Sequence, residues 1–126
     1  MEAIIKVDGK EVKMRASALI PRLYRFKFGR DIIKDMVGLK KAYKKAEDLP
    51  EDATEEQIKD AQLSVMDLTI FENVAYIMAK HADPTIPDNP DEWLDEFEMF
   101  SVYEIMPQLL TLWNISQKTT AVPKKK

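Results

Sequence analysis

His81 is the only histidine in this chain of 126 residues, and together with Asp83 it is the first candidate for acid–base chemistry. A catalytic histidine works with a nucleophile or a metal, but the sequence has no cysteine and no second histidine to share a zinc ion. The helix dipole also favours a histidine near a C-terminal end without any catalytic role. We therefore interpret His81 as a helix-end residue, rank a hydrolase that uses it far below other functions, and expect no catalytic residues and no cofactor.

A cluster of carboxylates offers oxygen ligands for Ca²⁺ or Mg²⁺. Helical spacing spreads such carboxylates along a surface, and the segment lacks the alternating ligands and the glycine of an EF-hand loop. A glycosidase-type carboxylate pair stays open, although no pocket-forming pattern supports it. We interpret the cluster as a solvated face or a docking face for basic partners, and expect no metal. Its members are Asp91, Glu92, Asp95, Glu96 and Glu98.

Residues 24–30, Tyr-Arg-Phe-Lys-Phe-Gly-Arg, interleave aromatic and basic side chains, as surfaces that stack on single-stranded nucleic acid do. The same segment fits an amphipathic helix that buries Leu19, Leu23 and Phe26. We favour the helix, because a protein of net charge −3 is a poor phosphate binder unless its basic face is isolated. The basic side chains remain candidate contacts to another protein: Arg22, Arg25, Lys27 and Arg30.

The last quarter of the chain is strongly aromatic and apolar. Most of these side chains are expected in the core, but two short bent helices cannot bury all of them. An exposed remainder would mark a protein interface. The candidate contact residues are Trp93, Phe97, Phe100, Tyr103 and Trp113.

Charge is sorted along the chain. Residues 1–45 carry 13 Lys or Arg against 5 Asp or Glu, residues 46–104 carry 2 against 17, and residues 105–126 carry 4 against none. Such segregation steers association between molecules. We expect a homo-oligomer in which the basic N-terminal half of one copy meets the acidic segment of the next.

Two short alternating runs, residues 3–7 and 12–15, flank Asp8-Gly9, a pair that supplies the positive backbone angles of a tight turn. The pattern predicts a β-hairpin with Ile5 and Val7 on one face. An isolated hairpin is only marginally stable in water, so this one is expected to pack on helices.

Helix signals follow the hairpin. Ser17 is predicted to cap a helix that ends at Phe28, where Gly29 provides the stop. Asp31 is predicted to cap the next helix, and Gly38 inside that helix predicts close packing or a bend, because glycine weakens a helix by about 1 kcal/mol relative to alanine.

Thr54 and Gln57 form a capping box for a long helix that we extend to Ala82. Its polar stripe changes sides midway, which predicts a central helix buried on different sides along its length. Beyond a proline-containing loop, further helices are expected over residues 91–99 and 101–115.

These elements predict an α+β, mostly α-helical fold, in which an N-terminal β-hairpin packs on about five helices with one long central helix. We expect a single domain over residues 1–117 and a disordered Lys-rich tail over residues 118–126. The N-terminus lacks the pattern of a secretion signal, and no stretch approaches the roughly 18 apolar residues of a membrane span. The sequence therefore predicts a soluble cytoplasmic protein without membrane contact.

Several segments together carry a family likeness that covers most of residues 1–117. They are the Asp8-Gly9 hairpin, Phe28-Gly29-Arg30-Asp31, the helix Phe71 to His81 with Asp83-Pro84-Thr85-Ile86-Pro87 after it, Trp93 to Phe97, Ser101 to Pro107, and Leu112-Trp113. In this pattern of elements the chain resembles the tail assembly chaperones of long-tailed (siphovirus-type) phages and prophages of Gram-positive bacteria.

The resemblance implies a non-enzymatic protein that coats the tape measure protein and keeps it soluble until tail-tube subunits polymerise around it. The implied partners are the tape measure protein, the tail-tube protein and a longer product made by ribosomal frameshifting, for which Lys124 to Lys126 would suit a run of adenines. The protein is then expected in the host bacterial cytoplasm and not in the finished virion.

The alternative function is a small regulatory or nucleic-acid-binding module that uses the basic N-terminal half. Nucleic acid is not the expected partner, and salt-dependent retardation of DNA or RNA would promote this alternative. Its basic residues would be Arg22, Arg25, Lys27, Arg30, Lys40, Lys41, Lys44 and Lys45.

Overall fold

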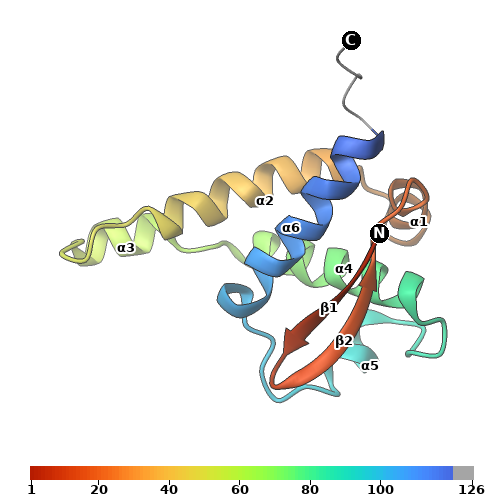
Figure 1. Cartoon of the computed structure of the whole chain (residues 1–126). Coiled ribbons are helices and arrows are strands. Elements are labelled where there is room, and N and C mark those ends of the chain that lie inside the picture. Colours follow the sequence, from red (N-terminus) through yellow and green to blue (C-terminus); the bar gives the residue numbers. More distant parts are fainter. Residues whose placement is uncertain (121–126) are drawn as a thin grey trace, which may run out of the picture.

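A computed structural model describes residues 1–120 and shows an antiparallel hairpin with six helices in this part of the chain (Figure 1). The predicted α+β, mostly helical fold is confirmed. In chain order the elements are β1 (Glu2–Val7), β2 (Lys10–Arg15), α1 (Ile20–Phe28), α2 (Ile32–Glu47), α3 (Glu55–Ala61), α4 (Val65–Ala82), α5 (Pro90–Leu94) and α6 (Val102–Thr120).

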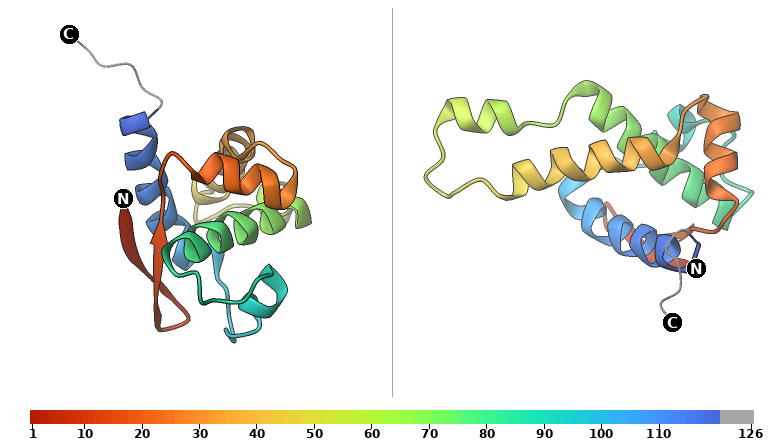
Figure 2. Two further views of the ribbon diagram at one scale, coloured as in Figure 1. Left: turned by 90° about the vertical axis from the view of Figure 1, so that its right-hand side faces the viewer. Right: turned by 90° about the horizontal axis from the view of Figure 1, so that it is seen from above.

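The hairpin closes through the predicted two-residue turn, with φ of 54° at Asp8 and 75° at Gly9. Positive φ at both positions matches the right-handed twist of the flanking strands, which fixes the register with Val7 opposite Lys10. The predicted inner face is confirmed, since Ile5 and Val7 are buried. β1 packs against α6 and β2 against α4, so the hairpin rests on helices as expected (Figure 2).

Long-range hydrogen bonds hold the hairpin to α6 and to the segment before it. The backbone N–H of Lys6 donates to Oε1 of Gln108 at 3.0 Å, and that of Asp8 donates to Oε1 of Glu104 at 2.9 Å. In return the Asp8 carboxylate accepts from the N–H of Glu98 at 3.0 Å. These contacts join residues about one hundred positions apart.

α4 is the central helix of the fold. It contacts α1, α2, α5, α6 and β2, and six consecutive residues, from Val74 to Ala79, are buried on all sides. A helix buried all round must be apolar all round, which this stretch is.

The prediction of one helix from Thr54 to Ala82 is wrong. The backbone turns extended between α3 and α4, with ψ of 140° at Gln62 and 165° at Ser64. Ser64 Oγ accepts from the N–H of Asp67 at 3.0 Å, and Oδ2 of Asp67 accepts from the N–H of Ser64 at 3.1 Å. This second capping box starts a new helix, and the polar stripe changes sides because two helices carry it.

The bounds of the other helices also differ from the prediction. α1 begins at Ile20, because Ser17 does not cap it: its Oγ accepts from the N–H of Leu19 at 3.2 Å in a turn before the helix. α5 ends at Leu94 instead of Met99, and α6 continues to Thr120 instead of Ile115. The predicted Lys-rich tail lies, for residues 121–126, outside the described residues.

The predicted caps at Gly29 and Asp31 are confirmed. Gly29 ends α1 with φ of 68°, and Asp31 accepts from the N–H of Ile33 at 2.9 Å. The prediction of close packing at Gly38 is wrong, because a Cβ at this position would meet no atom within 4 Å. Gly38 therefore weakens α2 without a compensating contact.

Residues 47–61 form an arm, which we define as the end of α2, the following loop and α3. The arm projects from the rest of the fold at the end away from α1 (Figure 2). Its helix α3 packs against α2, and nearly all side chains of the arm are exposed. Seven of its residues are Asp or Glu, against the single Lys59.

Candidate protein-binding groove

A groove of about 640 Å³ lies between α1 and the C-terminal half of α4, which are neighbours in the fold (Figure 1). Its apolar lining comes from Leu19 and α1 on one wall, and from α4 and the loop after it on the other. The apolar side chains are Leu19, Leu23, Phe26, Ile77 and Pro84. Phe26 is 71% exposed and Leu19 is 44% exposed, so two large side chains of this wall face solvent.

The amphipathic pattern of α1 explains this exposure. Ile20 and Tyr24 point inward and are completely buried, so Leu23 falls on the flank of this buried stripe and Phe26 falls on the face away from it. The predicted burial of Leu19 and Phe26 is therefore wrong. Leu23 is half-buried.

A buried hydrogen-bond network fixes α1 against α2. The hydroxyl of Tyr24 donates to Oδ2 of Asp35 at 2.7 Å, and Arg30 donates to both carboxylate oxygens of Asp35 at 2.8 Å. The Arg30 guanidinium holds the pKa of Asp35 below its usual value, although burial opposes this shift. Burial, and next the Asp35 carboxylate, raise the pKa of the Tyr24 hydroxyl. These bonds tie one wall of the groove to α2.

Lys80 fixes the opposite wall. Its ammonium donates to the carbonyl oxygens of Pro84 and Ile86 at 2.8 and 2.7 Å, and to Oδ1 of Asp88 at 2.9 Å. The Lys80 ammonium lowers the pKa of the Asp88 carboxyl group. Lys27 reaches across from α1 and donates to the carbonyl oxygen of Asp88 at 2.6 Å. The only carboxylate in the lining, among residues 1–120, is therefore paired with a cation.

His81 lies at the end of α4, as predicted, and its Nε2 is 2.8 Å from Oγ of Ser17. Ser17 Oγ also accepts from the N–H of Leu19, and the His81 tautomer decides which of the two side chains donates in their contact. Burial lowers the pKa of the His81 imidazole, and the positive charges of Arg15 and the N-terminus lower it further.

A hydroxyl beside an imidazole is the first half of a nucleophile–base pair, which also needs a group that orients the base. The nearby carboxylate of Asp83 is engaged elsewhere, because it accepts from the N–H of Thr85 at 3.0 Å and from its hydroxyl at 2.6 Å. The structure therefore shows a link between the N-terminal segment and α4, and no assembled triad within the described residues.

The structure separates the four basic candidates. Arg22 and Arg25 are exposed and flank the Phe26 ring, with guanidinium carbons 5.2 and 6.0 Å from its centroid. Lys27 lines the groove. Arg30 is committed to Asp35 and contributes to the fold.

The aromatic candidates lie mostly in the core. Trp93 and Trp113 are only 2% and 4% exposed, so they offer no surface to a partner. The half-buried rings of Phe97 and Phe100 pack edge-on against Trp93, with centroids 5.3 and 5.4 Å away. Only Tyr103 is well exposed, at 61%. The predicted aromatic interface is thus chiefly a structural cluster.

Sequence reasoning missed the α4 side of the groove, in particular Ile77 and Lys80. A usable signal was present in the loop after α4. Pro84 and Pro87 lack N–H groups but leave carbonyl oxygens, and a lysine at the end of the preceding helix is placed to donate to carbonyls in such a loop.

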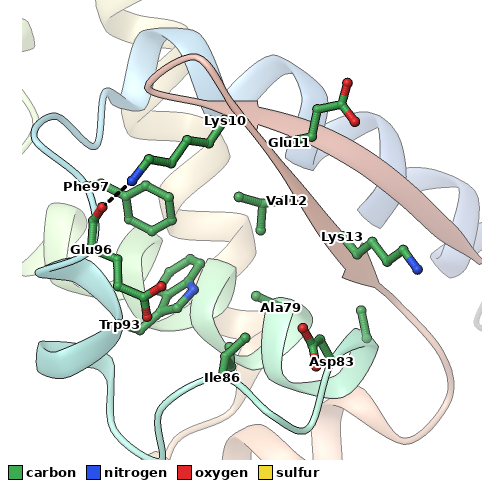
Figure 3. A pocket seen from close by; sticks show the side chains of 11 residues that line it. Lys10, Glu11, Val12, Lys13, Ala79, Asp83, Ile86, Trp93, Glu96 and Phe97 are labelled. Atoms are coloured by element: carbon green, nitrogen blue, oxygen red, sulfur yellow. Dashed lines mark hydrogen bonds between the residues drawn. The ribbon is translucent and has the colours of Figure 1, made fainter.

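A second cavity of about 550 Å³ lies between β2, α4 and the loops around α5 (Figure 3). Lys10 spans it, donating to the carbonyl oxygen of Glu96 at 2.6 Å with its ammonium 5.4 Å from the Phe97 ring. Its charged lining mixes both signs, since Lys10 and Lys13 stand beside Glu11, Asp83 and Glu96. Because both signs are present, the lining favours neither an anionic nor a cationic ligand.

Within residues 1–120, no three acidic or histidine side chains are grouped so that they could hold a metal ion. In the same part of the chain, no helix is both long enough and apolar enough to cross a membrane. Comparisons with protein-family models, curated proteins and solved structures give no match for this chain.

Proposed function

We propose that the protein is a non-enzymatic tail assembly chaperone of a long-tailed phage or prophage, which binds the tape measure protein in the host cytoplasm during tail assembly. The family likeness of the sequence supplies the identity of the client. The observation that carries the binding role is the open apolar groove between α1 and α4, with Phe26 71% exposed at its edge.

An exposed apolar groove is costly unless it is covered. Burying a large apolar side chain contributes about 1.5–3 kcal/mol, so covering Phe26 and Leu19 provides useful binding energy at a single site. A modest energy at each site suits a chaperone, because many copies can hold a long client together and still be displaced when the tail tube forms.

Self-association is part of the proposal. The arm carries seven acidic residues against one lysine, whereas residues 19–30 carry Arg22, Arg25 and Lys27, besides Arg30 that pairs with Asp35, and no acidic residue. Opposite charges at separated places on one molecule favour head-to-tail contacts between copies. The tail-tube protein and a frameshifted longer product are proposed as further partners.

Co-expression tests the proposed function directly. The proposal expects a tape measure protein that is found in the soluble fraction when it is co-expressed with this protein, and in aggregates without it. A Phe26→Ala variant should solubilise less of the client than a Val37→Ala variant, which removes a similarly exposed apolar side chain from α2. A client whose solubility is unchanged by this protein would refute the proposal.

One observation favours the alternative of nucleic-acid binding. Phe26 is exposed between Arg22 and Arg25, an arrangement that allows a base to stack on a ring flanked by cations. Retardation of single-stranded DNA or RNA that weakens with salt and is lost in Phe26→Ala would support this function.

A further inference from the structure

We infer that the groove between α1 and α4 takes an amphipathic helix whose apolar stripe is flanked by acidic side chains. This inference deepens the proposed function, on which it rests for the identity of the client as the tape measure protein. The chemistry of the occupant follows from three features of the groove: its apolar lining, its charge and its rigid walls.

The apolar lining fits a helix better than nucleobases. Leu19, Leu23 and Ile77 are aliphatic and accept the knobs of a helix, whereas Phe26 is the one exposed aromatic ring of the described lining on which a base could stack. The groove lies between α1 and α4, so a third helix laid in it would bury side chains at positions i, i+3, i+4 and i+7.

The charge around the groove selects an acidic occupant. Lys27 lines it, and Arg22 and Arg25 are exposed on α1 beside it. Asp88 is the only carboxylate in the described lining, and the Lys80 ammonium 2.9 Å away offsets its charge. Glutamates along the edges of a bound helix would meet these cations, whereas lysines there would be repelled.

Both walls are held before anything binds. The network of Tyr24, Arg30 and Asp35 fixes α1, and the three hydrogen bonds of Lys80 fix the loop after α4. Little ordering of the protein is then needed on binding, which preserves the affinity of a small contact area.

The test uses two labelled helical peptides of about 18 residues, or five turns, with the same leucine stripe. One peptide has glutamates beside the stripe and the other has lysines. Fluorescence anisotropy with the full chain should show about tenfold or greater preference for the glutamate peptide, and this preference should shrink as salt is raised.

Matched variants locate the binding to the groove. Phe26→Ala should weaken the glutamate peptide about tenfold while Val37→Ala, on α2, leaves its affinity within about twofold. Arg25→Glu should reduce the preference between peptides, and Lys41→Glu should not. Equal affinity for the two peptides, or equal effects of the two members of a variant pair, would overturn the inference.

Two other occupants are distinguishable outcomes that also overturn it. If Phe26→Ala dissociates an oligomer of the protein and neither peptide binds, the groove belongs to a second copy. If a single-stranded oligonucleotide displaces the glutamate peptide and binds more tightly, the groove belongs to nucleic acid. Client solubility on co-expression is scored separately, so the proposed function can stand while the groove assignment fails, or the reverse.

Discussion

The Tyr24 hydroxyl donates to the buried Asp35 carboxylate at 2.7 Å, and this bond joins α1 to α2 across a segment of eleven residues. The carboxylate also receives both hydrogen bonds from Arg30. The wall of the groove therefore depends on a polar network, and every buried side-chain nitrogen and oxygen atom in the described residues has a partner.

We expect Tyr24→Phe to lower the free energy of unfolding by about 2 kcal/mol, because a hydrogen bond to a charged group contributes about 1.5–3 kcal/mol. Urea denaturation monitored by circular dichroism measures the change. Tyr103→Phe is the matched control, since Tyr103 is 61% exposed, and should change stability by less than about 0.5 kcal/mol. Equal effects of the two substitutions would contradict the assigned network.

The lowered pKa of His81 predicts a loss of stability in mild acid. The folded imidazole resists protonation, whereas the unfolded one takes up a proton near pH 6.5. As pH falls through this value the unfolded state binds more protons and is favoured. The urea midpoint should therefore fall between pH 7.5 and about 5.5, and His81→Gln should flatten this part of the profile. A profile unchanged by the substitution would show that other groups control it.

Gly38→Ala should stabilise the protein by about 1 kcal/mol, because Gly38 lies inside α2 with open space where a Cβ would be. Gly29→Ala has equally open space but φ of 68°, so it should destabilise by about 1 kcal/mol. Thermal unfolding would place the two melting temperatures on opposite sides of the parent. Two shifts of the same sign would contradict the backbone argument.

Ser64→Ala distinguishes two helices from one. The capping box between Ser64 and Asp67 predicts that alanine destabilises the fold by about 1 kcal/mol. In one continuous helix the same change would stabilise, because alanine is the better helix former. The sign of the change in the urea midpoint therefore shows whether α3 and α4 are two helices or one. Thr69→Ala, later in α4 at an exposed position, shows the effect of alanine without a cap.

Self-association through the acidic arm should be sensitive to salt. Sedimentation at low salt is expected to show an oligomer that dissociates as ionic strength rises. Replacing Glu51, Asp52 and Glu55 by lysine should dissociate it at low salt. The same number of lysines at Asp91, Glu92 and Asp95 provides the control. A strict monomer at high concentration, or an oligomer indifferent to salt, would contradict the proposal.

Local signals predicted the fold well where one short segment decides the structure. Asp8-Gly9 specified the hairpin turn, Asp31 the start of α2, and Thr54 with Gln57 the start of α3. The break at Gln62 was missed because the change of side in the polar stripe was interpreted as uneven burial of one helix, and the second capping box at Ser64 was overlooked. The hydrophobic pattern reports which residues are buried, but not whether the helix axis changes direction.

The groove was only half predictable. The basic and aromatic residues of α1 are visible in the sequence, but Ile77 and Lys80 join them through the packing of α1 on α4, across about fifty residues. Burial of Trp93 was equally a tertiary outcome, since Tyr76 of α4 and Phe100 before α6 pack against its ring. Composition alone cannot separate a core aromatic cluster from an exposed one.

The hydrogen bonds between the hairpin and α6 can form only late in synthesis of the chain. β1 leaves the ribosome early, but Gln108, which bonds to Lys6, is translated 102 residues later. At about 5–20 residues per second this interval lasts about 5–20 seconds. Until then the hairpin lacks its α6 contacts, with Ile5 and Val7 facing the side that α6 and α4 later cover. The fold therefore remains incomplete until α6 emerges, and only then can the N-terminal hairpin pack against α6.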